Sequence, residues 1–336
     1  MGVLVLASCG VQGHAVEVPL TRPTLFPPDY TVGPNTPGSA ASAASRTTAA
    51  TMRPRPVPTV QSDGKARAVI TSTGVVAAVL AVRADGAFVI VSPCGNEVAV
   101  AKATPIVGAN VVLDPGHGGA PDPGTVGPTG LKESDLNLAV AQLVKTQLEA
   151  AGVKVVLTRT ADTYVTLASR ARIATSLAPD AFVSIHHNGA PDHYDDRPGT
   201  EVYYQADDEA RSKRLAGLIH EEVTGALAAK KIRWGWFADA GVKVRLNDRG
   251  SDYYGILRNA VGVPSVLAEL AYLTNAPEEA LLKTAEFRQV EAAAVARAIV
   301  RSLTTDDRGS GYVGPSQRKE EALGGGAAGC VDPPLQ

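Results

Sequence analysis

The sequence lacks the features that mark several protein classes. No apolar run approaches the roughly 20 residues that a helix needs to cross a bilayer, and only three cysteines occur among 336 residues. The net charge is −2, which gives no support for binding to nucleic acid. Apolar residues, by contrast, make up 45% of the chain, so a sizeable core can be buried. The length suits one large domain with something small beside it.

The first nine residues are nearly all apolar or small, and they end at Cys9 in Leu-Ala-Ser-Cys. This stretch resembles the lipobox of bacterial lipoproteins. We therefore expect residues 1–9 to be a truncated signal segment and Cys9 to anchor the protein by a lipid at the outer face of the cell membrane. The signal is incomplete, because no Lys or Arg precedes the apolar part and that part is short. A start codon placed too far downstream would explain both defects. A frayed apolar terminus with a chance cysteine is the alternative.

The other two cysteines, Cys94 and Cys330, each lie beside turn-forming residues. In an exported protein we expect this pair to form one disulfide that ties the C-terminal tail to the small domain. In a reducing compartment they would remain two free thiols.

Three segments outside the main domain differ in composition. Residues 10–64 are rich in Pro, Ser, Ala, Thr and Gly and have no apolar periodicity, so we expect a disordered linker. Residues 65–106 have apolar runs broken by turn signals, which predict three or four short antiparallel strands. This small β-domain is either an SH3-like barrel or a β-extension packed on the main domain. Residues 305–336 are polar and Gly-rich and are expected to form a flexible tail.

Residues 107–304 alternate between predicted strands and helices. Strands are expected at 109–113, 153–157, 181–185, 200–204, 254–257 and 265–270, and helices at 134–151, 165–177, 208–229, 278–283 and 286–303. This alternation implies βαβ units. The predicted fold class is therefore α/β, with a mostly parallel sheet flanked by helices on both faces and a small N-terminal β-domain before it.

Four chemically useful side chains lie near the carboxyl ends of these strands. His117 follows the first strand in Asp-Pro-Gly-His-Gly-Gly, Glu133 opens the next helix, His186 follows the strand at 181–185, and Glu269 lies at the end of the strand at 265–270. Ligands of open α/β sheets bind at the carboxyl ends of the strands, so we expect these side chains to converge. Two histidines and one carboxylate match catalytic zinc sites, which keep a position for water. A second carboxylate can serve as the general base.

The motifs around these residues resemble the zinc-dependent N-acetylmuramoyl-L-alanine amidases, the bacterial cell-wall amidases of the amidase-3 type. The motifs are Val-Val-Leu-Asp-Pro-Gly-His117-Gly-Gly, Gly130-Leu-Lys-Glu133-Ser-Asp, Phe182-Val-Ser-Ile-His186-His-Asn and Pro264-Ser-Val-Leu-Ala-Glu269-Leu-Ala-Tyr. The resemblance covers residues 109–303. It implies that His117, Glu133 and His186 bind one zinc ion per catalytic domain and that Glu269 is the catalytic carboxylate.

The resemblance also implies a reaction and a cellular setting. The expected reaction is hydrolysis of the amide between the lactyl group of N-acetylmuramic acid and L-alanine of the stem peptide, by zinc-activated water. Peptidoglycan is the expected partner, and the protein is expected to be an exported, extracytoplasmic monomer. The alternatives are a zinc carboxypeptidase or deacetylase acting on wall components, and a non-catalytic wall-binding protein.

Three further expectations concern the surroundings of the site. Adjacent strand side chains point to opposite faces, so only one histidine of the pair can face the metal. The resemblance selects His186 and leaves His187 as a bystander or a substrate contact. Trp234 and Trp236 form either a rim that contacts glycan or a hydrophobic anchor for their loop. Residues 230–243 are the one surplus segment between His186 and Glu269, so we expect an open groove rather than a helix that blocks the site.

Overall fold

The computed structural model describes residues 54–317, 326–327 and 329–336. The predicted signal segment with Cys9, and most of the predicted linker, lie outside the described residues. None of the helices in the described part of the chain has the length and apolarity to span a bilayer.

The N-terminal side of the protein is an antiparallel sheet of five strands. The strands are β1 (Ala68–Thr71), β2 (Val76–Val82), β3 (Phe88–Val91), β4 (Glu97–Val100) and β5 (Ala103–Ile106), in the order β4-β3-β2-β1-β5. The turn glycines predicted from the sequence have positive φ angles, for example 84° at Gly86 and 91° at Gly95. Such angles suit glycine because it has no Cβ. The sheet has one strand more than the largest number expected.

The main sheet has six strands and is mostly parallel. It contains β6 (Val111–Pro115), β7 (Val155–Leu157), β8 (Ala181–Asn188), β10 (Glu201–Tyr204), β12 (Val242–Lys243) and β14 (Ser265–Tyr272). The order is β12-β10-β14-β8-β6-β7, and β10 runs antiparallel to β14 while β14, β8, β6 and β7 are parallel. The carboxyl ends of β6, β8 and β14 therefore share one edge of the sheet. This arrangement confirms the predicted fold class.

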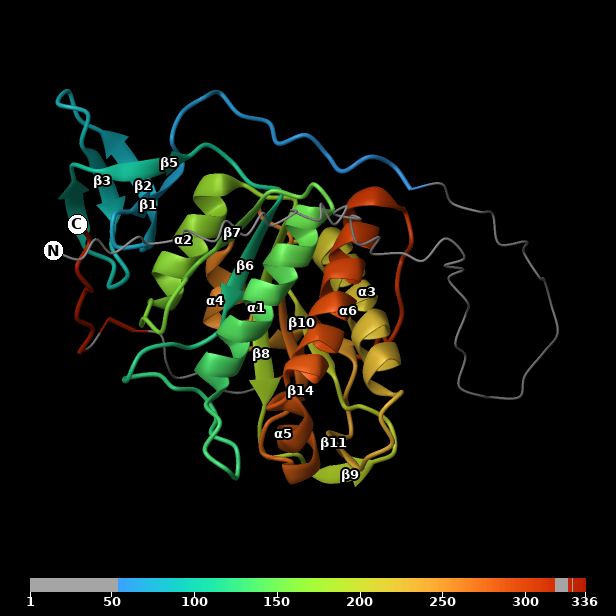
Figure 1. Cartoon of the computed structure of the whole chain (residues 1–336). Coiled ribbons are helices and arrows are strands. Elements are labelled where there is room, and N and C mark those ends of the chain that lie inside the picture. Colours follow the sequence, from blue (N-terminus) through green and yellow to red (C-terminus); the bar gives the residue numbers. More distant parts are fainter. Residues whose placement is uncertain (1–53, 318–325, 328) are drawn as a thin grey trace, which may run out of the picture.

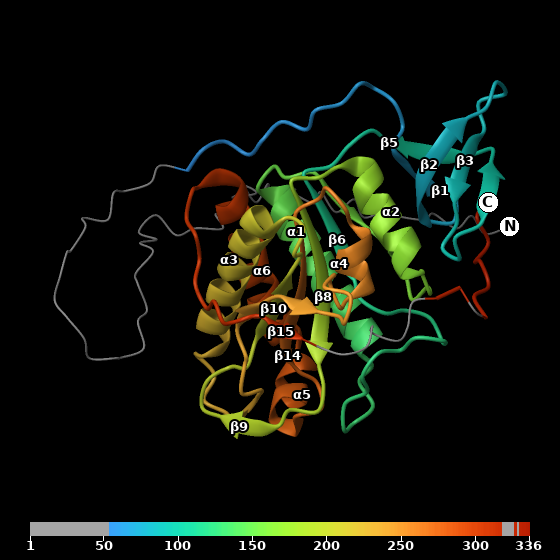
Figure 2. The same cartoon turned by 180° about the vertical axis from the view of Figure 1, so that it is seen from behind.

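Helices cover both faces of the main sheet (Figures 1 and 2). One face carries α1 (Glu133–Ala150), α3 (Glu209–Leu227) and α6 (Ala285–Thr304), and the other carries α2 (Leu167–Leu177) and α4 (Gly255–Asn259). The alternation of β6 shows how the two cores form. Val111 and Leu113 lie in the core under the first group of helices, whereas Val112 lies in the core under α2 and α4.

The predicted strand at 254–257 is wrong, because this segment belongs to helix α4. A four-residue apolar run fits a strand or one helical turn equally well. The edge of β14 is already occupied by β10. As a helix, the segment buries Ile256 and Leu257 in the core beside α2.

The remaining elements lie outside the two larger sheets. They are β9 (His193–Asp195), β11 (Trp234–Trp236), β13 (Arg245–Leu246), α5 (Ala276–Leu282) and β15 (Ser316–Gln317). Strands β9 and β11 pair with each other near α5, at the end of the molecule toward which β8 and β14 run (Figure 1).

The predicted disulfide between Cys94 and Cys330 is confirmed, with Cα atoms 5.6 Å apart. Hydrogen bonds reinforce this attachment. Asp332 accepts from the Ser92 hydroxyl at 2.7 Å and from the Cys94 backbone amide at 2.8 Å. Leu335 packs against the core of the small sheet. The end of the chain is thus bound to the small domain, as the disulfide prediction required.

Removing this disulfide should destabilise the protein substantially. The bond joins residues 236 positions apart, and a cross-link over so long a loop lowers the entropy of the unfolded chain. The free energy of unfolding of the double variant Cys94→Ala, Cys330→Ala should therefore be about 2–5 kcal/mol lower than that of the unchanged protein. Urea unfolding of the variant and of the unchanged protein, without reductant, measures this difference. Equal unfolding midpoints would show that the bond contributes nothing. Adding reductant should lower the midpoint of the unchanged protein and leave that of the variant where it is.

His220 on α3 should make stability depend on pH. Burial lowers its pKa from 6.5 to about 4. Between these values the unfolded chain binds a proton that the folded chain does not, so stability is full above pH 6.5 and falls as the pH falls toward 4. The contribution lost between pH 7.5 and pH 5 is about 2 kcal/mol. Urea unfolding at both pH values should show a smaller loss for His220→Leu. His193→Gln, a change at an exposed histidine, should lose as much stability between the two pH values as the unchanged protein does. A loss of the same size in His220→Leu would refute the role of His220.

Candidate active site

The loop after β6 places His117 at the edge of the sheet in an unusual backbone conformation. His117 has a φ of 60°, in the left-handed region that residues with a Cβ seldom adopt. Two side chains hold it there. The Arg170 guanidinium donates to the His117 carbonyl at 2.6 Å, and the His117 Nδ1–H donates to the Asp122 carboxylate at 2.6 Å. Backbone strain of this kind collects at functional sites.

Asp114 of the same motif anchors the loop from below. Its buried carboxylate forms an ion pair with Arg170 and accepts hydrogen bonds from Thr158 and Ser184. Burial alone would raise the pKa of Asp114, but the positive charge of Arg170 and these hydrogen bonds hold it below its ordinary value. Arg170 therefore joins Asp114 to the carbonyl of His117 and fixes where the imidazole lies.

Glu133, the first residue of α1, lies almost completely buried beside His117. Its Oε2 accepts from the Thr125 amide at 2.8 Å. Its Oε1 lies 3.3 Å from Nε2 of His117 and 3.0 Å from Nδ1 of His186. Gly124 makes room for this arrangement, because a Cβ at Gly124 would lie 2.7 Å from the Glu133 carboxylate.

The paired histidines at the end of β8 point to opposite faces, as strand alternation predicts. The His186 ring faces Glu133 and keeps 14% of its side chain exposed. The His187 side chain has no exposed area and contacts Asn137 and Glu291 in the interior. The side chain of His187 thus faces the interior and has no exposed surface for a substrate to contact.

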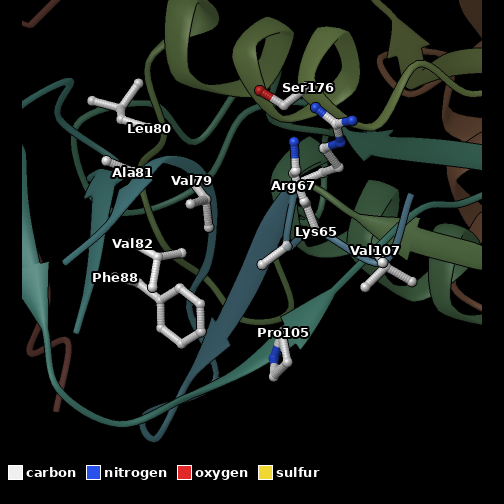
Figure 3. Close-up of a pocket in the computed structure, with 12 residues that line it drawn as sticks. Lys65, Arg67, Val79, Leu80, Ala81, Val82, Phe88, Pro105, Val107 and Ser176 are labelled. Carbon is white, nitrogen blue, oxygen red and sulfur yellow. The ribbon is translucent and has the colours of Figure 1, made fainter. Parts of the chain in front are cut away.

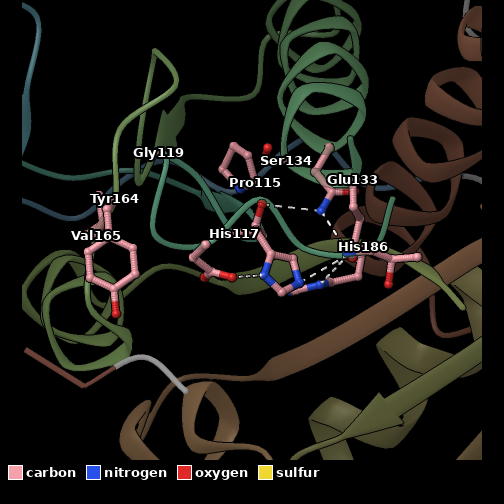
Figure 4. Close-up of polar contacts among 12 residues, drawn as sticks. Pro115, His117, Gly119, Glu133, Ser134, Tyr164, Val165 and His186 are labelled. Atoms are coloured by element: carbon pink, nitrogen blue, oxygen red, sulfur yellow. Dashed lines mark hydrogen bonds and ion pairs between the residues drawn. The ribbon is translucent and has the colours of Figure 1, made fainter. Parts of the chain in front are cut away.

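His117, Glu133 and His186 gather at one point. One potential ligand atom from each lies within 4.8 Å of the others. The rings of His117 and His186 meet edge to face with centroids 4.9 Å apart, and both turn toward Glu133 (Figure 4). Gly116 allows this approach, because a Cβ there would overlap the ring of His186. The group could hold a metal ion, with two imidazoles and one carboxylate as donors.

The protonation tendencies of these three groups follow from their contacts. Burial opposes a charge on His117, but hydrogen bonds to Asp122 and Glu133 raise its pKa to about 10. Burial lowers the pKa of His186, which favours the neutral imidazole that binds metals. Burial would raise the pKa of Glu133, but hydrogen bonds from His117 and His186 hold it well below its ordinary value. Glu133 is thus an anionic donor between two imidazoles.

Glu269 on β14 faces the same edge from the neighbouring strand. It is the register partner of His186 on one side and of Glu201 on the other. Its Oε2 is buried without a hydrogen-bond partner among the described residues. Burial, and then the negative charges of Glu133 and Glu201, raise its pKa well above the ordinary value. An unpartnered carboxylate beside further acids is a place where a cation would relieve the electrostatic cost.

Glu201 is held away from the two imidazoles by its own partners. Its carboxylate pairs with the buried ammonium of Lys243 and accepts from Asn188 at 2.5 Å and from the Tyr203 hydroxyl at 3.1 Å. Asn188, the last residue of β8, therefore bonds to Glu201. These partners balance the charge of Glu201, so that of these two neighbouring acids it is Glu269 that has an oxygen without a hydrogen bond.

Two residues that orient the site, Asp122 and Asn137, were not predicted from the sequence. Asp122 lies five residues after His117 in the same loop. A carboxylate at that short spacing is a signal that could have been used, because histidines that bind metals commonly donate their second N–H to a carboxylate. Asn137 is one helical turn beyond Glu133 and donates to it at 3.2 Å. The i, i+4 spacing could have indicated that contact.

The pair β9 and β11 lies at the end of the molecule toward which β8 and β14 run (Figure 1). Residues 230–243 form β11, β12 and turns, and contain no helix. Trp234 is fully buried and stacks near Phe287, so it anchors this loop. The guanidinium of Arg197 lies 4.8 Å from the centroid of the Trp236 ring. The side chains of His117 and His186 keep 27% and 14% of their area exposed, so solvent reaches both imidazoles.

A separate cavity of about 690 Å³ lies on the small sheet (Figure 3). Its walls are residues 64–67, part of β2, Phe88, Pro105, Val107 and Ser176. None of the four candidate site residues lines it. The chemistry at the edge of the main sheet is therefore distinct from this hollow.

Comparison with known proteins gives one consistent family. The Amidase_3 family model, described as N-acetylmuramoyl-L-alanine amidase, matches residues 111–301. The uncharacterized protein YqiI of Bacillus subtilis is 37% identical over 209 residues, which cover 62% of this chain and 89% of YqiI. The N-acetylmuramoyl-L-alanine amidase LytC of the same organism is 36% identical over 192 residues, covering 57% of this chain and 35% of LytC.

A solved structure agrees with the sequence relatives. Cwp6 from Clostridium difficile matches with a TM-score of 0.52 and 29% identity, over 59% of this chain and 30% of Cwp6. The chain thus spans most of the length of YqiI but only about a third of LytC and Cwp6.

Proposed function

The chain belongs to the Amidase_3 family of N-acetylmuramoyl-L-alanine amidases, and from this membership we propose that it cleaves peptidoglycan. The bond hydrolysed is the amide between the lactyl group of N-acetylmuramic acid and L-alanine of the stem peptide. The observation that carries the proposal is the convergence of His117, Glu133 and His186 within 4.8 Å, with Glu269 on the neighbouring strand.

We propose that His117, Glu133 and His186 hold one zinc ion. Two imidazoles and one carboxylate are a donor set of catalytic zinc sites, and three protein ligands leave a position for water. The donors also fit in charge, because Glu133 is anionic and burial favours the neutral imidazole of His186, while His117, whose pKa is raised, would release a proton when the ion binds. Bound zinc would supply Lewis acidity, which lowers the pKa of water toward ~7 and polarises the substrate carbonyl.

Glu269 is the proposed general base. It takes a proton from the attacking water as the oxygen of that water bonds to the lactyl carbonyl carbon. When the carbon–nitrogen bond breaks, Glu269 returns the proton to the nitrogen of L-alanine, which leaves as an amine. The unpartnered Oε2 of Glu269 supports this role, because no other described group competes for its lone pairs.

The residues around the ligands keep this geometry fixed before substrate arrives. Asp122 accepts from Nδ1 of His117, so Nε2 of that ring is the nitrogen turned toward Glu133. Arg170 holds the carbonyl of His117. Preorganisation of this kind removes motions that would otherwise have to be frozen during the reaction.

We further propose that the protein acts outside the cytoplasm as a monomer. Its proposed substrate lies there, and the Cys94–Cys330 disulfide suits an oxidising compartment. A lipid on Cys9 would attach it to the membrane surface. The proposed catalytic domain is 107–304, preceded by the small β-domain at 65–106 and the linker at 10–64, and followed by the tail at 305–336.

Product analysis of digested cell walls tests the proposed reaction. Purified sacculi incubated with the full chain should release intact stem peptides with a free N-terminal alanine, detected by mass spectrometry, and a chelator should abolish their release. Release of a terminal amino acid or of acetate would instead favour a zinc carboxypeptidase or deacetylase. Binding to sacculi without any release would favour a non-catalytic wall-binding protein.

A further inference from the structure

A buried polar chain lies behind the three ligand candidates and runs from β8 to α6. The Nδ1–H of His187 donates to the side-chain oxygen of Asn137 at 2.8 Å. On the other side of the ring, Nε2 of His187 lies 3.5 Å from Oε1 of Glu291. The side chains of His187 and Glu291 have no exposed area, and Asn137 is fully buried.

Asn137 connects this chain to two parts of the site. Its amide nitrogen donates to Oε1 of Glu133 and to the carbonyl of Gly116, each at 3.2 Å. Because the nitrogen faces both acceptors, the side-chain oxygen has to face a donor, and the Nδ1–H of His187 is that donor. The backbone amide of His187 also donates to Oε1 of Glu133 at 3.2 Å. Asn137 and His187 thus both donate hydrogen bonds to Oε1 of Glu133.

Glu291 is otherwise difficult to explain. Both of its carboxylate oxygens, and Nε2 of His187, are buried without a hydrogen bond to any described residue. A buried carboxylate in that position is costly unless a neighbouring group shares a proton with it. Because Nδ1 of His187 is hydrogen-bonded to Asn137, Nε2 is the ring nitrogen that faces Glu291. Helix α6 packs on α1 and so brings Glu291 within contact of His187.

We propose that Glu291, His187 and Asn137 form a positioning chain that fixes the carboxylate of Glu133 and thereby sets the metal affinity of the site. This inference rests on the proposed function to the extent that Glu133 binds the ion. Asn137 also fixes the Gly116 carbonyl, next to the ligand His117, so one side chain aligns two ligands. Groups that orient metal ligands in this way typically change affinity by about 10–100-fold when they are lost.

The test compares zinc dissociation constants of full-chain variants, measured by competition with a chromophoric chelator. Asn137→Asp keeps the shape and the acceptor for His187 but turns an oxygen toward Glu133, so its dissociation constant should rise about 10–100-fold. Glu291→Leu should raise it in the same direction. Glu291→Gln, which can still donate to Nε2 of His187, should keep an affinity close to that of the unchanged protein.

A matched control separates positioning from general loss of stability. Glu222 on α3 is a buried acid that pairs with Arg297 and Arg301 of the same helix α6. Glu222→Gln should lower the urea midpoint and leave zinc affinity unchanged. At saturating zinc, the kcat of Asn137→Asp should approach that of the unchanged protein, because the substitution is expected to weaken zinc binding and not the reaction itself.

The outcomes distinguish this inference from the proposed function. If folded Asn137→Asp and Glu291→Leu bind zinc as tightly as the unchanged protein, the positioning chain is refuted while the zinc site stands. If one of these two variants does not fold, the zinc dissociation constant of the other decides whether the positioning chain exists. Restored affinity in Glu291→Gln then shows that the contact with His187 is responsible. If the unchanged protein binds no zinc that depends on His117, both the proposed function and this inference fall.

Discussion

Replacing Glu269 with alanine is expected to lower kcat by about 10²–10⁴-fold, the range typical for loss of a general base, while zinc stays bound at one equivalent. The reason is the position of Glu269 beside the ligands. Glu269, on β14, is the register partner of His186, but it is not one of the three potential donors that lie within 4.8 Å of one another. Its removal should therefore affect proton transfer rather than metal retention.

The measurement pairs turnover of a soluble muropeptide with zinc analysis of the same sample. Glu269→Gln should behave like the alanine variant, because an amide of the same shape cannot accept the proton. Glu279→Gln is the control. Glu279 is a buried acid at the same end of the molecule, but its carboxylate is occupied by the amide and hydroxyl of Thr129. Full turnover by Glu269→Ala would remove Glu269 from the reaction.

Replacing His117 or His186 with alanine should abolish both zinc binding and turnover. Each supplies one of only three donors, so the loss of zinc affinity should exceed the about 10–100-fold typical of residues that merely orient ligands. His193→Ala, a change at an exposed histidine, should keep one equivalent of zinc and full activity. Atomic emission analysis after dialysis gives the metal content. One equivalent of zinc retained in His117→Ala would contradict the proposed ligand set.

Much of the site could be predicted from the sequence because its chemistry is tied to strand ends. His117, His186 and Glu269 follow or end strands that the apolar runs identify, and the carboxyl ends of parallel strands meet at one edge. Strand alternation also separated His186 from His187 correctly. The disulfide was likewise predicted, because Cys94 and Cys330 are the two cysteines that remain in an exported protein whose Cys9 carries a lipid.

What could not be predicted depends on contacts between distant elements. Glu291 reaches His187 only because α6 packs on α1 at a particular rotation, and no local pattern encodes that rotation. The segment that became α4 has too few residues for its periodicity to choose between strand and helix. The strain at His117 also depends on Arg170, whose side chain comes from α2 on the far side of the loop.

Anomalous diffraction at the zinc absorption edge, from crystals of the full chain grown with one equivalent of zinc, tests the proposed zinc site most directly. A single peak is expected, bonded to one imidazole nitrogen each of His117 and His186 and to a carboxylate oxygen of Glu133, at about 2.0–2.2 Å, with Glu269 facing the open position. The absence of a peak there, or a peak held by other side chains, would contradict the proposed zinc site.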